Sequence, residues 1–237
     1  MILEICTDNL NDAIIAADNG ADRIELNSAL KLGGLTPSIG LVKAVKSKVE
    51  IPVIAMLRPR AGGFRYSPAE FSTMLMDAME LIDAGVDGIA FGILNEYNEI
   101  DTVRCQEIVV MDSNIEWVFH RAFDDIEDHR ENLGCLIKLG FNRVLTSGGC
   151  KIALEGLKLL RELNYAAAGR IAILAGSGIN KDNVQYIVEN SGCKEIHASL
   201  SRQTVMGRGS LFSTILNRIS SDEVKKVRSI LDSLKHY

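Results

Sequence analysis

The sequence lacks the features of membrane-spanning, nucleic-acid-binding and secreted chains. No apolar run approaches the roughly 20 residues that a membrane helix needs. The 26 basic residues are scattered and the formal net charge is −5, so no positive patch is expected for a phosphate backbone or an anionic membrane. The first residues, MILEICTDNLNDAI, place Glu4 and Asp8 within an otherwise apolar start and have no basic stretch, unlike a signal peptide. These absences predict a cytoplasmic protein without nucleic-acid or membrane partners.

Paired cysteines are absent as well. The five cysteines are odd in number, widely spaced and form no CxxC pair. This pattern disfavours a disulfide framework and is typical of reduced thiols in a cytoplasmic protein. No linker, low-complexity stretch or charge block divides the 237 residues, which predicts one domain over residues 1–237.

One phrase recurs four times: a helical pattern ends in glycine, and a strand-like run follows about three residues later. It reads GADRIEL from Gly20, GVDGIAF from Gly85, GFNRVLT from Gly140 and GCKEIHAS from Gly192. A glycine just past a helix supplies the left-handed C-cap, and the apolar, often β-branched run after it is typical of a strand. The repeats therefore predict four connections from helix to strand.

Four more strands are expected at residues 2–6, 52–57, 115–119 and 171–175, which makes eight. Helical patterns follow the strands at about residues 9–19, 39–48, 68–84, 101–111, 127–139, 152–163, 181–190 and 222–235. This alternation predicts an α/β chain folded as a single (β/α)8 TIM barrel with parallel strands. A doubly wound open sheet is the alternative, but CTDNLN after the first strand lacks the glycine-rich phosphate fingerprint, so no nucleotide cofactor is expected.

Two of the predicted loops are long. Residues 27–38 follow the second strand and carry KLGGLTP, and residues 200–220 follow the eighth strand and carry SRQTVMGRGS. Long loops at the carboxyl ends of barrel strands are the expected rims or lids of a site.

In a TIM barrel the carboxyl ends of the strands carry the chemistry and the opposite face carries stability. A structural role is therefore expected for the polar residues that open strands, namely Asp22, Arg23, Asn142, Arg143 and Glu195. Polar side chains also gather at the carboxyl ends. There Glu4 and Glu25 are expected to meet Arg58 or Arg60, because an ionised carboxylate inside a barrel needs a partner. The group is either a structural ion-pair lattice or a pocket whose arginines bind an anionic or oxygen-rich ligand.

His120 stands in WVFHRAFD, where the fifth strand becomes a loop, with Asp124 four residues later. An imidazole and a carboxylate at a pocket mouth are the minimum for proton transfer near neutral pH. A lone histidine is also commonly a partner of backbone groups. His120, Asp124 and Glu25 are the candidate catalytic residues.

The sixth and seventh strands end in glycine-rich turns, and the eighth ends in HAS, with His197 and Ser199. Glycines let backbone N–H groups approach a ligand closely, and TIM barrels often bind phosphate near strands 7 and 8, although both turns could be purely structural. The candidate anion-binding residues of the turns are Thr146, Ser147, Gly148, Gly149, Gly176, Ser177 and Gly178.

These motifs resemble those of the CutC family in order and spacing over about residues 1–200. They are EICTDN, GADRIELN, GGLTPS, IPVIAMLRPRAGGFRYS, GVDGIAFGIL, FHRAFD, RVLTSGG, GSGIN and EIHAS. The resemblance implies a TIM barrel, assembly as a homo-oligomer (dimer or tetramer), and a cytosolic role in copper homeostasis through Cu(I) binding.

The sequence matches the family motifs at some positions and departs from them at others. The cysteine of the first motif is Cys6, the implied copper ligand, but the position that is cysteine in many members is Asn27 here. Cu(I) prefers two or three soft sulfur ligands, so this replacement predicts weak copper binding unless Met56 or Cys150 substitutes. The family's RPRGGDF motif appears as RPRAGGF from Arg58, without its acidic residue, and its GGGI motif appears as GSGI.

Two functions of different classes follow. The first is a copper-handling protein anchored by Cys6. The second is a barrel enzyme without a redox cofactor, acting on a small anionic or sugar-like substrate. In the second, Arg58 and Arg60 hold the substrate, His120 with Glu25 moves protons, and the turns after strands 6 and 7 cradle an anion. Asn27 separates the two, because a second cysteine at that position would favour copper.

Overall fold

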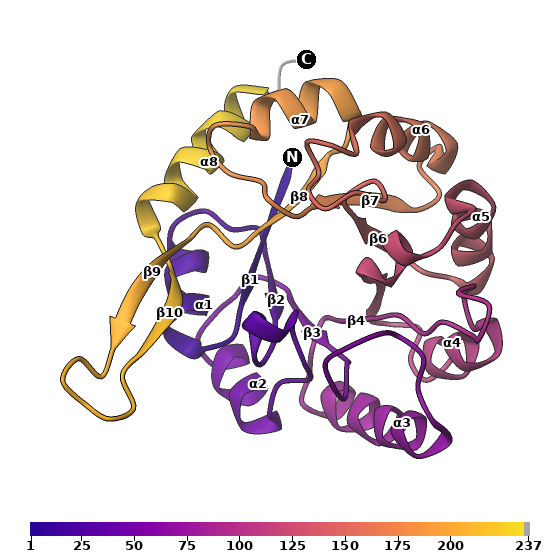
Figure 1. The fold of residues 1–237 in the computed structure, drawn as a ribbon, viewed down its shortest axis with the longest axis horizontal. Helices are drawn as coiled ribbons and strands as arrows, with labels where there is room; N and C mark the ends of the chain where they lie inside the picture. Colours follow the sequence, from indigo (N-terminus) through magenta and orange to yellow (C-terminus); the bar gives the residue numbers. More distant parts are fainter. Residues whose placement is uncertain (235–237) are drawn as a thin grey trace.

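Eight parallel strands close into a barrel in chain order, and the helices form a ring outside it (Figure 1). The structure is a computed structural model that describes residues 1–234. Each strand pairs with the next one along the chain, and β8 returns to pair with β1, which confirms the predicted (β/α)8 TIM barrel. The barrel strands are β1 (Ile2–Thr7), β2 (Arg23–Leu26), β3 (Val53–Met56), β4 (Gly88–Phe91), β5 (Glu116–Phe119), β6 (Arg143–Thr146), β7 (Ala172–Gly176) and β8 (Glu195–Ala198).

The helices lie within a few residues of their predicted positions in most cases. At the start of the helix Pro68–Asp83 (α3), the Ser67 side chain accepts a hydrogen bond from the Glu70 N–H, Glu70 reaches back to the Ser67 N–H, and Pro68 is the first helical residue. None of the described helices is both long and apolar enough to cross a membrane. The described α-helices are α1 (Leu10–Asp18), α2 (Ile39–Lys46), α3 (Pro68–Asp83), α4 (Thr102–Val109), α5 (His129–Leu139), α6 (Leu157–Ala167), α7 (Val184–Ser191) and α8 (Ser221–Ser233). The predicted end of the last helix, Lys235, lies outside the described residues.

The sixth helix differs from its prediction, because it begins at Leu157 and not at residue 152. The preceding residues fold back against the turn after β6. A side chain at position 156 would place its Cβ 1.9 Å from the Ser147 carbonyl oxygen, so only glycine fits at this position. This close approach delays the start of the helix.

The segment 200–220, predicted as a loop, forms an antiparallel hairpin of β9 (Ser201–Met206) and β10 (Thr214–Ile219). The hairpin projects beyond the ring of helices beside α1 (Figure 1). The other long loop, 27–38, contains a short 3-10 helix, η1 (Leu30–Leu32), and is closed by a bridge between Ser28 and Leu35. A second 3-10 helix, η2 (Arg121–Asp125), follows β5.

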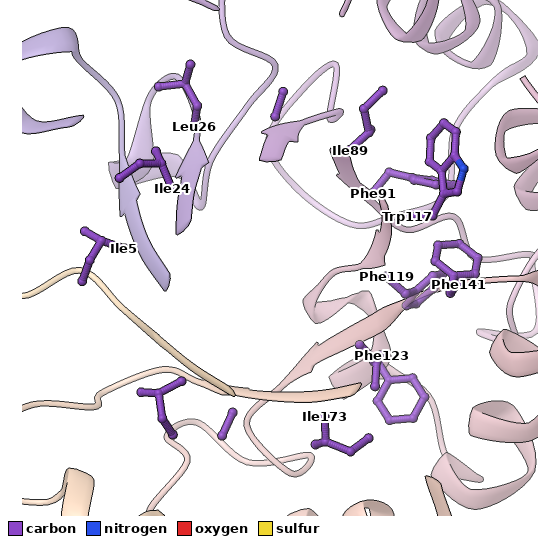
Figure 2. Packing of buried hydrophobic residues seen from close by; sticks show 14 of the residues in the cluster. Ile5, Ile24, Leu26, Ile89, Phe91, Trp117, Phe119, Phe123, Phe141 and Ile173 are labelled. Atoms are coloured by element: carbon purple, nitrogen blue, oxygen red, sulfur yellow. The ribbon is translucent and has the colours of Figure 1, made fainter. Parts of the chain in front are cut away.

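The main hydrophobic core lies between the barrel and the helices. Successive strand residues point to opposite sides, so alternate apolar residues of each strand face the helices. Figure 2 shows Phe91, Trp117, Phe119 and Phe141 gathered on one side of this layer. The Phe141 ring lies 5.3 Å from that of Phe91 and 5.4 Å from that of Phe119.

The inside of the barrel is divided between apolar and ionisable side chains. A separate apolar cluster of Ile54, Met56, Ala90 and Val118 comes from β3, β4 and β5. Strands β8, β1 and β2 supply ionisable side chains instead. The candidate site therefore lies toward the seam where β8 meets β1.

Candidate functional site

The floor of the barrel is an ion-pair network. Arg143 binds Glu116 and Glu195, with N–O distances of 2.5 and 3.0 Å, and Arg23 binds Glu195 at 2.7 Å. Both arginine side chains are 6% exposed. These contacts support the structural role predicted for residues that open strands.

Glu4 extends the network upward from the floor. It lies opposite Arg23 in the register of β1 and β2 and opposite His197 in that of β1 and β8. Its carboxylate binds Arg23 Nε at 2.5 Å and His197 Nδ1 at 2.7 Å. Burial raises the pKa of Glu4, but Arg23 and His197 outweigh it and lower the pKa to about 2.

Glu25 occupies the next position on β2 that faces the interior and has no salt bridge among the described residues. Its Oε2 atom accepts a hydrogen bond of 2.8 Å from the Asn27 amide. Burial raises the pKa of Glu25, and the nearby His197 does not offset this effect. Glu25 therefore binds a proton more readily than a glutamate in water does.

His197 connects Glu4 with the thiol of Cys6. Burial lowers the pKa of His197, but Cys6, Glu25 and Glu4 together outweigh it and raise the pKa well above 6.5. The Cys6 thiol donates to the Ala198 carbonyl oxygen at 3.8 Å, next to His197 in β8.

A cavity of about 480 Å³ opens above these groups, at the carboxyl ends of the strands. TIM-barrel enzymes hold their active sites at this face. Of the residues singled out in the sequence, those lining the cavity are Cys6, Glu25, Asn27, Met56, Arg58, His120, Ser177, Gly178, His197 and Ser199. The structure thus brings together groups from β1, β2, β3, β5, β7 and β8.

Arg58 is a buried cation in this cavity, and no carboxylate contacts it among residues 1–234. Its guanidinium donates to the carbonyl oxygens of Leu32, Gly34 and Gly62, at 3.1, 3.0 and 2.6 Å. Its Nε has no hydrogen-bond partner among the described residues. The expectation that Glu4 or Glu25 would meet Arg58 or Arg60 is wrong, because the strand register places Glu4 against Arg23 and Glu25 beside Asn27.

His120 is 3% exposed and neutral. Burial and the charge of Arg58 lower its pKa to about 3. Its Nδ1 accepts the N–H of Ala122 at 3.2 Å, so the proton is assigned to Nε2, which has no partner among the described residues. The Phe64 ring packs against His120 at 4.8 Å between centroids and lies under the Arg58 guanidinium at 5.1 Å. Two buried N–H donors thus border the same cavity.

Asp124 does not line the cavity and forms no hydrogen bond with His120 among the described residues. Its carboxylate accepts hydrogen bonds from the Thr146 hydroxyl, from the Ser147 N–H and hydroxyl, and from the Gly149 N–H. It also binds Arg121 Nε at 2.7 Å. The anion at the turn after β6 is therefore a side chain of the same protein, and Thr146, Ser147, Gly148 and Gly149 lie outside the cavity.

Arg60 is likewise outside the cavity, since it forms a salt bridge with Glu70 at the start of α3. The prediction that Arg60 converges with Glu25, Arg58 and His120 is wrong.

The turn after β7 lies at the cavity, where a ligand-binding turn was predicted. Ser177 lines the cavity with a φ of +80°, unusual for a residue other than glycine, and Gly178 follows with +71°. Gly176 ends β7 and packs against Leu145 and His197.

The model of the CutC family matches residues 1–202. The chain belongs to the CutC family. A CutC family protein of Treponema denticola is 47% identical over 202 residues, which is 85% of this chain and 82% of that protein. The human copper homeostasis protein cutC homolog is 40% identical over 97% of this chain and 87% of its own length. The crystal structure of CutC from Streptococcus agalactiae is 33% identical, with a TM-score of 0.80 over 84% of this chain and 98% of that chain.

Membership of the CutC family directs attention to the sulfur atoms of the cavity. Cys6 and Met56 both line it, whereas Cys150 does not. Two lining residues, Phe64 and Arg121, were not among the predicted site residues. The contact between His197 and Glu4 was also missed, because it depends on the register between β1 and β8, for which the sequence carries no signal.

Proposed function

We propose that this protein acts in copper homeostasis by binding Cu(I) at the barrel mouth, with Cys6 as the anchoring ligand. The proposal is supported by family membership, by the name of the human relative, and by the presence of both Cys6 and Met56 in the lining of the cavity. In this role copper is the cargo of the protein and not a resident cofactor. A cytoplasmic location and a homo-oligomeric assembly, dimer or tetramer, belong to the same proposal.

The donor atoms of the cavity fit Cu(I) only in part. Cys6 offers a thiol and Met56 a thioether, both soft ligands of the kind that Cu(I) prefers. Asn27 offers an amide where a second thiol would complete a two-sulfur site. The expected affinity is therefore weaker than that of a site with two thiolates.

The test is a Cu(I) titration under reducing conditions against a chromogenic Cu(I) chelator. We expect Cys6→Ser to abolish binding, and Asn27→Cys to strengthen it at least tenfold by supplying the second thiol. Cys135→Ser on α5, outside the cavity, is the matched control and should bind as the wild type does. Unchanged binding in Cys6→Ser would refute Cys6 as the anchor. Tight stoichiometric binding by the wild type would show that Met56 or another ligand completes the site.

Arg58 favours a second candidate function, a cofactor-independent barrel enzyme acting on a small anionic or sugar-like substrate. A buried guanidinium without a carboxylate partner is costly, and an oxyanion in the cavity would relieve this cost. In this role Arg58, Ser177, Gly178 and Ser199 contact the substrate. His120 polarises it as a neutral donor, and Glu25 supplies or accepts the proton.

A panel of phosphates, sugar phosphates and carboxylates tests this candidate through thermal unfolding. A ligand at one hundred times its dissociation constant should stabilise the protein by about 2.7 kcal/mol. Arg58→Ala should remove the ligand-dependent increment, whereas Arg60→Ala should keep it, because Arg60 lies outside the cavity. No increment with any ligand would leave Arg58 as a structural residue.

A further inference from the structure

We propose that Glu4, Glu25 and His197 bind a divalent cation at the floor of the cavity. One carboxylate oxygen from each glutamate and a ring nitrogen of His197 all lie within 4.8 Å of one another. Glu4 and Glu25 are buried, and the His197 side chain is 12% exposed. The three come from adjacent strands, β1, β2 and β8, so the closed barrel holds them on a rigid frame.

The charges in the barrel favour a cation at this place. Arg23 and Arg143 contact Glu4, Glu116 and Glu195, but among the described residues no guanidinium contacts Glu25. A divalent cation bound to Glu4, Glu25 and His197 would place positive charge beside Glu25, the carboxylate that lacks a guanidinium partner.

The donor atoms select the kind of metal. Two carboxylates and one imidazole are hard or borderline ligands, which suit Zn²⁺ or Mn²⁺ and not Cu(I). Ligand atoms about 2.0–2.2 Å from a tetrahedral Zn²⁺ ion lie about 3.3–3.6 Å apart. The three ligand atoms now lie within 4.8 Å of one another, so side-chain rotations that draw them closer would complete the site. Three protein ligands also leave a coordination position open, which is the arrangement of catalytic zinc sites.

Neighbouring groups already hold the ligands in place. Arg23 binds the Glu4 oxygen that does not face His197, and the Asn27 amide binds Glu25. Such contacts orient the ligands of natural metal sites. In addition, the Asn27 Oδ1 atom is buried and has no hydrogen-bond partner among the described residues. Rotation of this amide would turn that oxygen toward the cation as a further ligand, in place of the hydrogen bond that the amide now donates to Glu25.

The cation site and the Cu(I) site are separable, because Cys6 is not among the three ligands. Glu25 and His197 line the cavity, so a bound cation would face the same space as Arg58. An oxyanion ligand would then meet two positive groups. Cation binding at this place does not depend on the copper proposal.

Calorimetric titration of the metal-free protein with ZnCl2 and with MnCl2 tests the site. We expect one equivalent to bind, and Glu25→Gln and His197→Gln each to weaken binding at least tenfold. Glu116→Gln removes a carboxylate from the same network but outside the cluster, and it should bind as the wild type does. Cys6→Ser should also leave Zn²⁺ and Mn²⁺ binding unchanged.

Circular dichroism and urea midpoints of each variant separate lost binding from lost folding. Glu25→Gln is the decisive variant, because Glu25 makes only one side-chain hydrogen bond among residues 1–234 and its replacement has the same shape. Absence of binding at millimolar Zn²⁺ and Mn²⁺, or full binding by Glu25→Gln, would overturn the inference. Loss of binding in Cys6→Ser would also overturn it, by placing the metal at the thiol. Failure of Cu(I) binding alone would refute only the copper proposal.

Discussion

The Nδ1 atom of His197 lies 2.7 Å from Oε1 of Glu4, across the pair of strands that closes the barrel. The two residues are 193 positions apart in the chain. Their contact therefore exists only when β8 returns to β1. It joins the ion pairs of the barrel floor to the cavity above.

Glu4→Gln should strongly destabilise the protein. The substitution leaves Arg23 and His197 without the carboxylate that both contact, and removing one partner of a buried ion pair costs about 3–5 kcal/mol. Urea unfolding measures the loss. Asp182→Asn is the control, since Asp182 is exposed and within residues 1–234 forms a salt bridge only with Lys181, and it should change stability by less than about 1 kcal/mol. Equal effects of the two substitutions would contradict the assigned network.

His120 should make the protein less stable as the pH falls. Its pKa is about 3 in the folded protein and ordinarily 6.5, so only the unfolded chain binds a proton between these values. Stability is therefore lost progressively below pH 6.5, by up to about 1.4 kcal/mol per pH unit. His120→Asn should flatten this part of the stability profile. An imidazole that NMR shows to be protonated at about pH 5, between the two pKa values, would refute the assignment.

Asp124→Ala should loosen the turn after β6. The carboxylate accepts hydrogen bonds from Thr146, Ser147 and Gly149, and their loss leaves these donors unsatisfied, at a cost of about 3 kcal/mol. Hydrogen exchange at the Ser147 and Gly149 amides should accelerate. Asp125→Ala, at the adjacent exposed position, should change stability by less than about 0.5 kcal/mol. Unaltered exchange in Asp124→Ala would contradict the role of this side chain.

Two glycine substitutions should have opposite effects. A Cβ atom at Gly92 would lie 2.6 Å from His120 Nδ1, so Gly92→Ala should displace the imidazole and destabilise the protein by about 1–3 kcal/mol. Gly134 lies within α5 with open space around its Cβ position, so Gly134→Ala should stabilise by about 0.5–1 kcal/mol. Thermal unfolding of both variants gives the comparison, and the same sign for both would refute the packing at Gly92.

The sequence alone determined the barrel fold and the face of the barrel on which the site lies. The repeated glycine-then-strand phrases predicted the strands β2, β4, β6 and β8, and the alternation predicted the closed barrel. Because all strands of a parallel barrel end on one face, Glu25, Arg58, Arg60 and His120 were expected at one mouth, and all of them except Arg60 line one cavity. The hairpin of β9 and β10 escaped prediction, since most of its residues are exposed and it shows no alternation of buried and exposed positions.

Only the tertiary structure decided which groups contact one another. The register between neighbouring strands places Glu4 against Arg23 and His197, and strand patterns do not encode register. Arg60 lies beyond the strand end, where the local path of the loop carries it to Glu70. Asp124 reaches the turn after β6 because two loops meet in space. The residue types and their order determine which charged groups lie at the mouth of the barrel. The closure of the barrel and the stagger of its strands determine which of those charges are neutralised.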